Sequence, residues 1–236
     1  MYVASAACYV LAGVIILCIP AIFIRRHREP ATLQYLFGGL HYILSKPIIL
    51  GAITLDLFAT LLGGAVALLP IYARDILQTG PLGLGLLRSA PALGAVVASL
   101  YLVRSPLTHS VGKILFVSVT AFGVTTIIFG LSTWLPLSLL ALVIMGTADM
   151  VSVVIRSSLV QLETPDEMRG RVSAVHSLFT GTANHLGQFE SGATAAWWGT
   201  VPSVVIGGIG TLAVVALWLR WFPDLIKREV IAARRE

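Results

Sequence analysis

The chain has 236 residues, of which 57% are hydrophobic and only 11% are charged, with a net charge of +5 at pH 7. A soluble domain carries about 25% charged residues, so this chain has too few to cover a surface that faces water. The composition predicts a membrane protein and excludes an ordinary soluble domain.

Apolar stretches of about 20 residues can cross a bilayer as helices. Seven such stretches follow one another along the chain, which predicts an all-α polytopic membrane protein. The first stretch ends in the basic sequence RRHR and lacks a small-residue cleavage site, so no signal peptide is expected. The predicted spans are residues 3–24, 48–72, 83–103, 114–132, 137–158, 172–198 and 203–222.

The basic residues predict the orientation of these spans, because cytoplasmic loops are enriched in Lys and Arg. If RRHR is cytoplasmic, Arg74 lies outside, Arg88 lies within a span, and the other basic residues share the cytoplasmic side. We therefore expect an external N-terminus and a cytoplasmic tail at 223–236. A nucleic-acid-binding protein would need a clustered, solvent-exposed basic domain, which this sequence lacks, so no nucleic-acid partner is expected. The residues expected on the cytoplasmic side are Arg25, Arg26, Arg28, Lys46, Arg104, Lys113, Arg156, Arg169, Arg171, Arg220, Lys227, Arg228, Arg234 and Arg235.

The segment between the first two spans has apolar residues every three or four positions. Within residues 25–47 this spacing predicts an amphipathic helix at the membrane surface, and a plain connector is the alternative. The six later spans form two blocks of three, 48–132 and 137–222, with opposite topology. Such inverted repeats occur in transporters. We expect a first span at 1–24, this linker, a six-helix domain at 48–222 and the tail.

Ionisable residues inside the spans are candidates for function, because burial in a membrane is costly without a partner. They are Asp56, Arg88, Asp149 and Glu190, with His185 as a weaker case. Asp149 lies closest to mid-membrane and is the best candidate for a proton-coupling group; a structural hydrogen-bonding role is the alternative. Arg88 either snorkels to the surface, forms a buried ion pair with Glu190 at similar depth, or binds substrate.

The span at 172–198 carries a continuous polar and small-residue face that is unsuited to lipid. It lines either a tight helix interface or a water-filled cavity. Together with the acids, it gives the candidates for a substrate cavity or proton coupling: Asp56, Asp149, Asn184, Gln188 and Glu190. The two stripes of the face are Ser177, Gly181, Asn184, Gln188, Ser191 and Ala195, and beside them Ala183, Gly187, Glu190 and Thr194.

Two further patterns concern packing at the second and third spans. Ala90, Gly94 and Ala98 form a ridge of small residues that lets another helix approach closely. Arg74 and Asp75 are expected to pair at the outer surface.

Enzyme and metal signatures are absent from the sequence. It contains no HExxH, GxSxG or Walker motif and no Cys/His metal spacing. Cys8 and Cys18 are ten residues apart on one predicted helix, about 15 Å, so they cannot form a disulfide. We expect no enzymatic activity, no cofactor and no metal.

Three segments carry a resemblance to a known family. ALLPIYARDILQTGPLGLGLLRSAPALGA (67–95) and TPDEMRGRVSAVHSLFTGTANHLGQFESG (164–192) resemble exporters of the major facilitator superfamily, in the enterobactin-exporter group. YLFGGLHYILSKP resembles the cytoplasmic linker helix of this group. The turn with Pro165, Arg169, Gly170 and Arg171 resembles a motif found across the superfamily. The later part of the second segment, FTGTANHLGQFESG, is more specific to the enterobactin-exporter group.

The resemblance implies that the seven spans correspond to helices six to twelve of a twelve-helix transporter. It further implies a proton-coupled antiporter in the bacterial inner membrane that exports a drug, siderophore or other small metabolite by alternating access. Its partners would be protons, substrate, the lipid bilayer and a missing N-terminal half or second half-transporter. The loop VRSPLTHSVGK (103–113) keeps only Gly112 and Lys113 of the family's loop motif. The alternative is a truncated, non-transporting membrane half that needs a partner or is an inert or regulatory remnant.

Overall fold

A computed structural model describes residues 10, 13–15, 33–105 and 110–228 of the chain. The chain divides into two compact units, 1–31 and 32–236. In the first unit, residues 10 and 13–15 are helical, and the rest of the predicted span at 3–24 lies outside the described residues. Every regular element in the described part is helical, which confirms the all-α class.

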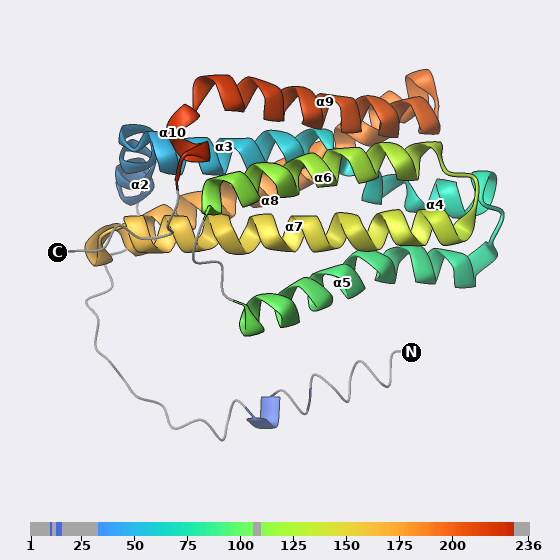
Figure 1. Ribbon diagram of the computed structural model, residues 1–236, viewed down its shortest axis with the longest axis horizontal. Coiled ribbons are helices and arrows are strands. Elements are labelled where there is room, and N and C mark those ends of the chain that lie inside the picture. The colour runs from blue at the N-terminus through green and yellow to red at the C-terminus, as the bar shows by residue number, and fades with distance from the viewer. Residues whose placement is uncertain (1–9, 11–12, 16–32, 106–109, 229–236) are drawn as a thin grey trace. The chain divides into compact units, whose positions relative to one another are not determined.

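In the second unit, long helical rods lie alongside one another, and successive rods run in opposite directions (Figure 1). The first rod is built from four shorter segments and the others are single helices. A short helix precedes the rods and another follows them. The helices are α2 (Leu33–Ser45), α3 (Pro47–Leu62), α4 (Leu69–Ile71), α5 (Gly80–Arg104), α6 (Val111–Leu131), α7 (Leu135–Glu163), α8 (Asp166–Trp198), α9 (Thr200–Trp221) and α10 (Pro223–Ile226).

Five helical stretches in the described part are long and apolar enough to cross a membrane. They match five of the predicted spans, with ends that differ by several residues. The predicted span at 172–198 forms a helix as well, α8, which has 33 residues but is more polar than the others. The five stretches are Pro47–Ile76, Gly80–Arg104, Val111–Leu131, Leu135–Glu163 and Thr200–Trp221.

The first rod departs from the uninterrupted helix expected at 48–72. The α-helix α3 ends at Leu62, and after Gly63 a tighter 3₁₀ segment η1 (Gly64–Leu68) follows. A wider π-helical turn η2 (Tyr72–Ile76) comes after α4. A Cβ on Gly64 would lie 2.5 Å from the Gly187 carbonyl oxygen of α8. Pro70 has no N–H to continue a helical ladder. The two glycines and the proline therefore break the rod where α8 crosses it.

The ridge of small residues on α5 packs directly on α7, as the sequence predicts. Ala90, Gly94 and Ala98 are all buried. A Cβ on Gly94 would lie 2.0 Å from the Val143 carbonyl oxygen of α7, and Thr147 donates a hydrogen bond of 3.1 Å to the Gly94 carbonyl. These contacts hold the two backbones closer together than larger side chains would allow.

The helix α2 lies within the predicted linker at 25–47, and one of its faces packs on protein. Ile43 belongs to a buried cluster with Val172 and Val175 of α8. Tyr42 donates a hydrogen bond of 2.9 Å to the Glu163 carbonyl at the end of α7. Burial and, to a smaller degree, the Glu163 carboxylate raise the pKa of Tyr42, so its hydroxyl remains a proton donor.

The segment after α9 folds back over the start of α6. The Gly112 amide donates to the Arg228 carbonyl at 3.0 Å, and a Cβ on Gly112 would lie 1.9 Å from the Leu225 carbonyl oxygen. The Arg228 guanidinium forms an ion pair with Glu163 at the end of α7. We call this contact the α10 clasp, because it ties α6, α7 and α10 together at one end of the helices.

Candidate substrate cavity

A cavity of about 280 Å³ lies among α3, η1, α5, α6, α7 and α8. Its wall mixes apolar side chains with carboxylates, amides and hydroxyls, which would be costly against lipid. Four of the five predicted cavity residues line it. The lining consists of Asp56, Thr60, Gly63, Gly64, Val66, Pro91, Phe122, Met145, Gly146, Asp149, Val153, Arg156, Thr180, Asn184 and Gln188.

Asp56 of α3 and Arg156 of α7 form an ion pair at one side of the cavity. Their side chains are 9% and 3% exposed. Asp56 lies nine residues after the first residue of α3, and Arg156 lies seven residues before the last residue of α7. Since both of these helix ends lie at the end that carries α10, the two charges sit at similar depth, about 11–14 Å along the helices.

Arg156 was counted with the cytoplasmic basic residues, although the predicted span at 137–158 contains it. In the structure it lies inside the apolar stretch Leu135–Glu163, buried against Asp56. Its Nε atom is buried and has no hydrogen-bond partner, so the guanidinium is incompletely satisfied. His176 of α8 is close enough to interact electrostatically with Arg156. Asp56 and Arg156 both lie within predicted spans, and this was the signal in the sequence that could have revealed the ion pair.

Asp149 occupies the midpoint of α7, fourteen residues from either end. Its side chain is exposed to the cavity, and the structure gives it no ion pair and no hydrogen bond within the described residues. It lies near enough to Asp56 and Arg156 for all three charges to interact. Two carboxylates and one guanidinium carry a charge of −1 when all are ionised. This cluster therefore has room for one added positive charge, from a proton or a ligand.

The polar face of α8 divides between the two roles that the sequence left open. Asn184 and Gln188 line the cavity, and the Asn184 amide donates to the Thr180 carbonyl at 2.9 Å. On the neighbouring stripe Ala183 and Gly187 are buried, and so is Ser191 at the far end of the first stripe. A Cβ on Gly187 would lie 2.7 Å from the Thr60 carbonyl oxygen, so this stripe is a tight interface with the first rod.

The remaining predicted site residues lie away from this cavity. Glu190 is partly exposed on α8 and is not among the lining residues. Arg88 is exposed on α5, and no ion pair joins it to Glu190 in the part of the chain that the structure describes. His185 is exposed on α8 and also lies outside the lining.

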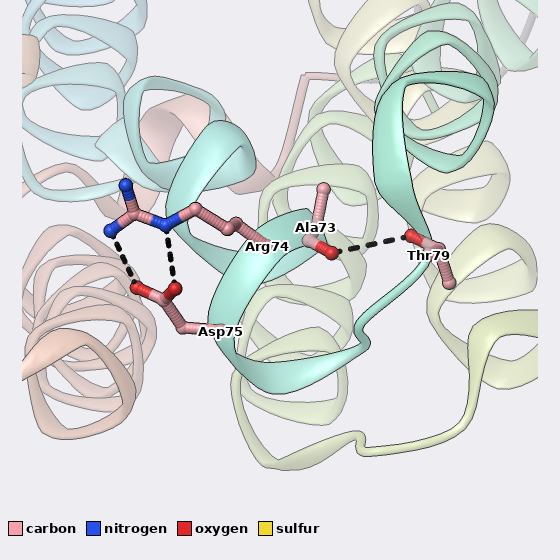
Figure 2. Close-up of polar contacts among 4 residues, drawn as sticks. All are labelled: Ala73, Arg74, Asp75 and Thr79. Carbon is pink, nitrogen blue, oxygen red and sulfur yellow. Dashed lines mark hydrogen bonds and ion pairs between the residues drawn. The ribbon is translucent and has the colours of Figure 1, made fainter.

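The predicted surface pair forms at the end of the helices opposite α10. Figure 2 shows the Arg74 guanidinium facing the Asp75 carboxylate, with Nε–Oδ1 and Nη2–Oδ2 distances of 2.6 and 3.0 Å. In the same view Thr79 donates to the Ala73 carbonyl and closes the turn into α5. A second hollow of about 520 Å³ adjoins this turn, but among the described residues Arg74 is its one charged lining residue and is already paired. The polar cavity is the better candidate site.

The turn with Pro165, Arg169, Gly170 and Arg171 starts α8. The Pro165 carbonyl accepts hydrogen bonds from the Met168 and Arg169 amides, and Arg169 pairs with Asp166 at 2.7 Å. Gly170 is exposed. The Arg171 side chain lies beside Gly38 of α2. The turn therefore joins α7, α8 and the linker helix, and it is remote from the cavity. No group of three or more His, Cys, Asp or Glu within the described residues could hold a metal ion.

Known proteins are similar in sequence to this chain along most of its length. An enterobactin exporter, EntS, from Escherichia coli O1:K1 is 27% identical over 195 residues, which are 82% of this chain and 46% of that protein. The EntS protein of Citrobacter koseri is 28% identical over 198 residues, 83% of this chain and 47% of its own. The chain thus spans about half the length of these relatives. No solved structure matches it significantly.

The family model of the Major Facilitator Superfamily matches residues 2–188, well over half of the chain. This match agrees with an all-helical fold whose apolar helices enclose a polar cavity. It indicates a multi-pass membrane protein of a transporter family and not an enzyme. The chain belongs to the Major Facilitator Superfamily.

Proposed function

We propose that this chain forms the C-terminal half of a proton-coupled exporter of small molecules in a bacterial inner membrane. The observation that carries the proposal is the polar cavity at the middle of a set of membrane-crossing helices. A wall with carboxylates, amides and hydroxyls at that depth suits a transported solute and is costly for any purely structural purpose. The relatives are named enterobactin exporters, which supports export as the direction. Drugs, siderophores or other metabolites are the class of solute that the sequence resemblance implies.

Proton coupling is assigned to the cluster of Asp56, Asp149 and Arg156. Asp149 can bind a proton without breaking an existing contact, because its carboxylate has no hydrogen bond or ion pair among the described residues. Asp56 is held by Arg156 and would release it on protonation. A change of charge at this cluster alters contacts between α3 and α7, which gives protons a route to bias the conformation.

Alternating access in this family requires two helical halves that move against each other around a central site. Under the proposal, the open side of the cavity faces a second half, either a separate N-terminal half or another copy of this chain. The end of the helices with α10 and the basic tail faces the cytoplasm.

The proposal is tested by proton movement in everted membrane vesicles. The chain is expressed alone and, in a second arm, together with the N-terminal half of a related exporter. After respiration acidifies the vesicles, a transported compound should release protons and restore the fluorescence of a pH-sensitive dye. We expect this release in at least one arm, with its loss in Asp149→Asn and its retention in Glu167→Gln, an exposed acid remote from the cavity.

Absence of proton release in both arms, for a panel of cationic, neutral and anionic compounds, would contradict the proposal. That result would favour the alternative of a non-transporting membrane half with a regulatory role or none. Release that survives Asp149→Asn unchanged would keep export and remove Asp149 from the coupling step.

A further inference from the structure

A small recess adjoins the cavity between α3, α6 and α7. It measures about 10 Å³ and shares Asp56, Thr60, Phe122 and Asp149 with the cavity wall. A space of this size holds about one water-sized group. The recess therefore selects for a small terminal group, whereas the larger cavity beside it can hold the rest of a solute.

Ser152 of α7 lines the recess and has an unsatisfied hydroxyl. The residue is 3% exposed, and its oxygen atom has no hydrogen-bond partner. A buried hydroxyl without a hydrogen-bond partner is destabilising, because it loses its bonds to water without gaining others. The recess is thus incomplete as it stands, and an occupant that hydrogen-bonds to Ser152 would complete it.

The charge around the recess is negative. Asp149 contributes a carboxylate without an ion pair among the described residues, whereas the Asp56 carboxylate is held by Arg156. Arg156 is the cavity's one cationic lining residue in the described chain, and the Asp56 carboxylate already compensates its charge. The wall that this chain provides is therefore suited to a positive group.

We propose that the recess binds the primary ammonium group of a cationic substrate, with Asp149 as its counter-ion and the Ser152 hydroxyl as a hydrogen-bond acceptor. The inference rests on the proposed transport function, for which it names a substrate class. A water molecule can fill the same space but leaves the charge uncompensated. An ammonium has the size of water, donates hydrogen bonds to both oxygens and neutralises the cluster.

The remainder of such a substrate would lie in the larger cavity against Asn184 and Gln188. Their amides offer donors and acceptors without adding charge. A proton on Asp149 and an ammonium beside it would exclude each other, since each removes the same charge. The charged groups that line the cavity or the recess are Asp56, Asp149 and Arg156, and His176 of α8 interacts electrostatically with Arg156.

The test measures equilibrium binding of small probes to the full chain in lipid nanodiscs near neutral pH. Benzylamine, protonated under these conditions, represents the primary ammonium, and benzyl alcohol is the neutral match of similar shape. Benzyltrimethylammonium carries the same charge on a group too large for the recess, and benzoate supplies the opposite charge. We expect benzylammonium to bind most tightly, benzyltrimethylammonium and the alcohol more weakly, and benzoate least.

The variants separate charge from space. Asp149→Asn should weaken benzylammonium binding by roughly ten- to hundredfold, the usual effect of a hydrogen bond to a charged group, and leave benzyl alcohol binding unchanged. Ser152→Ala should weaken benzylammonium binding by a smaller factor. Glu167→Gln, remote from the cavity, should match the wild type. The thermal unfolding of each variant shows whether Asp149→Asn remains folded. Asp149→Glu, which keeps the carboxylate, is the comparison for it.

Equal affinity for all probes, no detectable binding, or benzylammonium binding that survives Asp149→Asn would each overturn the proposal. If Asp149→Asn does not fold, Ser152→Ala and the preference over benzyltrimethylammonium decide the matter, because both report on the recess. If sodium ions displace benzylammonium and Ser152→Ala has no effect, the recess is a site for an inorganic cation and the ammonium proposal is wrong. Because no transport is measured, failure of binding leaves proton-driven export standing, and binding without transport leaves this inference standing.

Discussion

The helix α7 uses two of its sides in opposite ways. Toward α5 it presents Val143 and Gly146, whose backbones meet Gly94 and Pro91 almost without side chains between them. Toward α3 and α8 it presents Asp149 and Arg156, which line a cavity. The first contact is stabilised by close packing of small residues. The second depends on the ion pair between Arg156 and Asp56. A single helix can therefore anchor one neighbour tightly while leaving space beside the others.

The largest effect is expected from breaking the buried ion pair. Arg156→Met leaves Asp56 charged and unpartnered in a buried position, which should lower the free energy of unfolding by about 3–5 kcal/mol. The double variant Asp56→Asn, Arg156→Met should recover most of this loss, because no buried charge remains. Denaturation in detergent micelles measures both, and Arg88→Met, an exposed arginine, is the control. If Arg156→Met is as stable as the wild type, water reaches the Asp56 carboxylate freely.

The next largest effect concerns the dry contact between α5 and α7. Gly94→Ala should lower the free energy of unfolding by about 1–3 kcal/mol, because the added methyl meets the Val143 carbonyl. Gly85→Ala on the same helix has open space around it and should be neutral or slightly stabilising. Melting temperatures of the two variants compare them directly. Equal temperatures would mean that the helices separate easily at this point.

A smaller effect is expected at the α10 clasp, where the charges are partly solvated. Arg228 and Glu163 are 23% and 29% exposed, so Arg228→Ala should cost about 1 kcal/mol or less. Faster amide hydrogen exchange at the start of α6 would report this loss, because the Gly112 amide bonds to the same segment. The exposed neighbour Lys227 provides the matched control, Lys227→Ala. If amide hydrogen exchange is identical in Arg228→Ala and Lys227→Ala, the α10 clasp is stabilised by its backbone contacts and not by the ion pair.

The smallest effect is expected at the surface pair of Arg74 and Asp75. Their side chains are 80% and 47% exposed, so water already satisfies much of their charge. Arg74→Ala should leave the melting temperature unchanged within error, in contrast to Arg156→Met. A clear drop would indicate that the turn before α5 depends on this pair.

Much of the helical architecture could be predicted because it depends on local pattern. Apolar length predicted the spans, and the spacing of Ala90, Gly94 and Ala98 predicted the α5 face that meets α7. The break of the first rod was missed, although Gly63, Gly64 and Pro70 signal it locally. Its position depends on the approach of Gly187 from α8, which a single sequence does not contain.

The candidate site was predicted in part for a similar reason. A polar stripe in an apolar helix indicates that some partner exists, and this led to Asp56, Asp149, Asn184 and Gln188. Which partner each stripe meets depends on tertiary packing. Thus Gly187 and Ser191 proved to belong to a helix interface, and Glu190 lies outside the cavity lining. Arg156 was counted with the basic residues of the cytoplasmic side because positive charge usually marks membrane borders.

The most direct test asks whether the cavity face of α8 is in contact with water. With Cys8 and Cys18 replaced by serine, single cysteines are placed at Asn184, which lines the cavity, and at Phe189, which is 75% exposed on another side of α8. A charged, water-soluble thiol reagent is applied to the protein in lipid bilayers. A water-filled cavity predicts rapid labelling of Asn184→Cys and slow labelling of Phe189→Cys. Rapid labelling at 189 with protection at 184 would contradict a polar transport cavity in this chain.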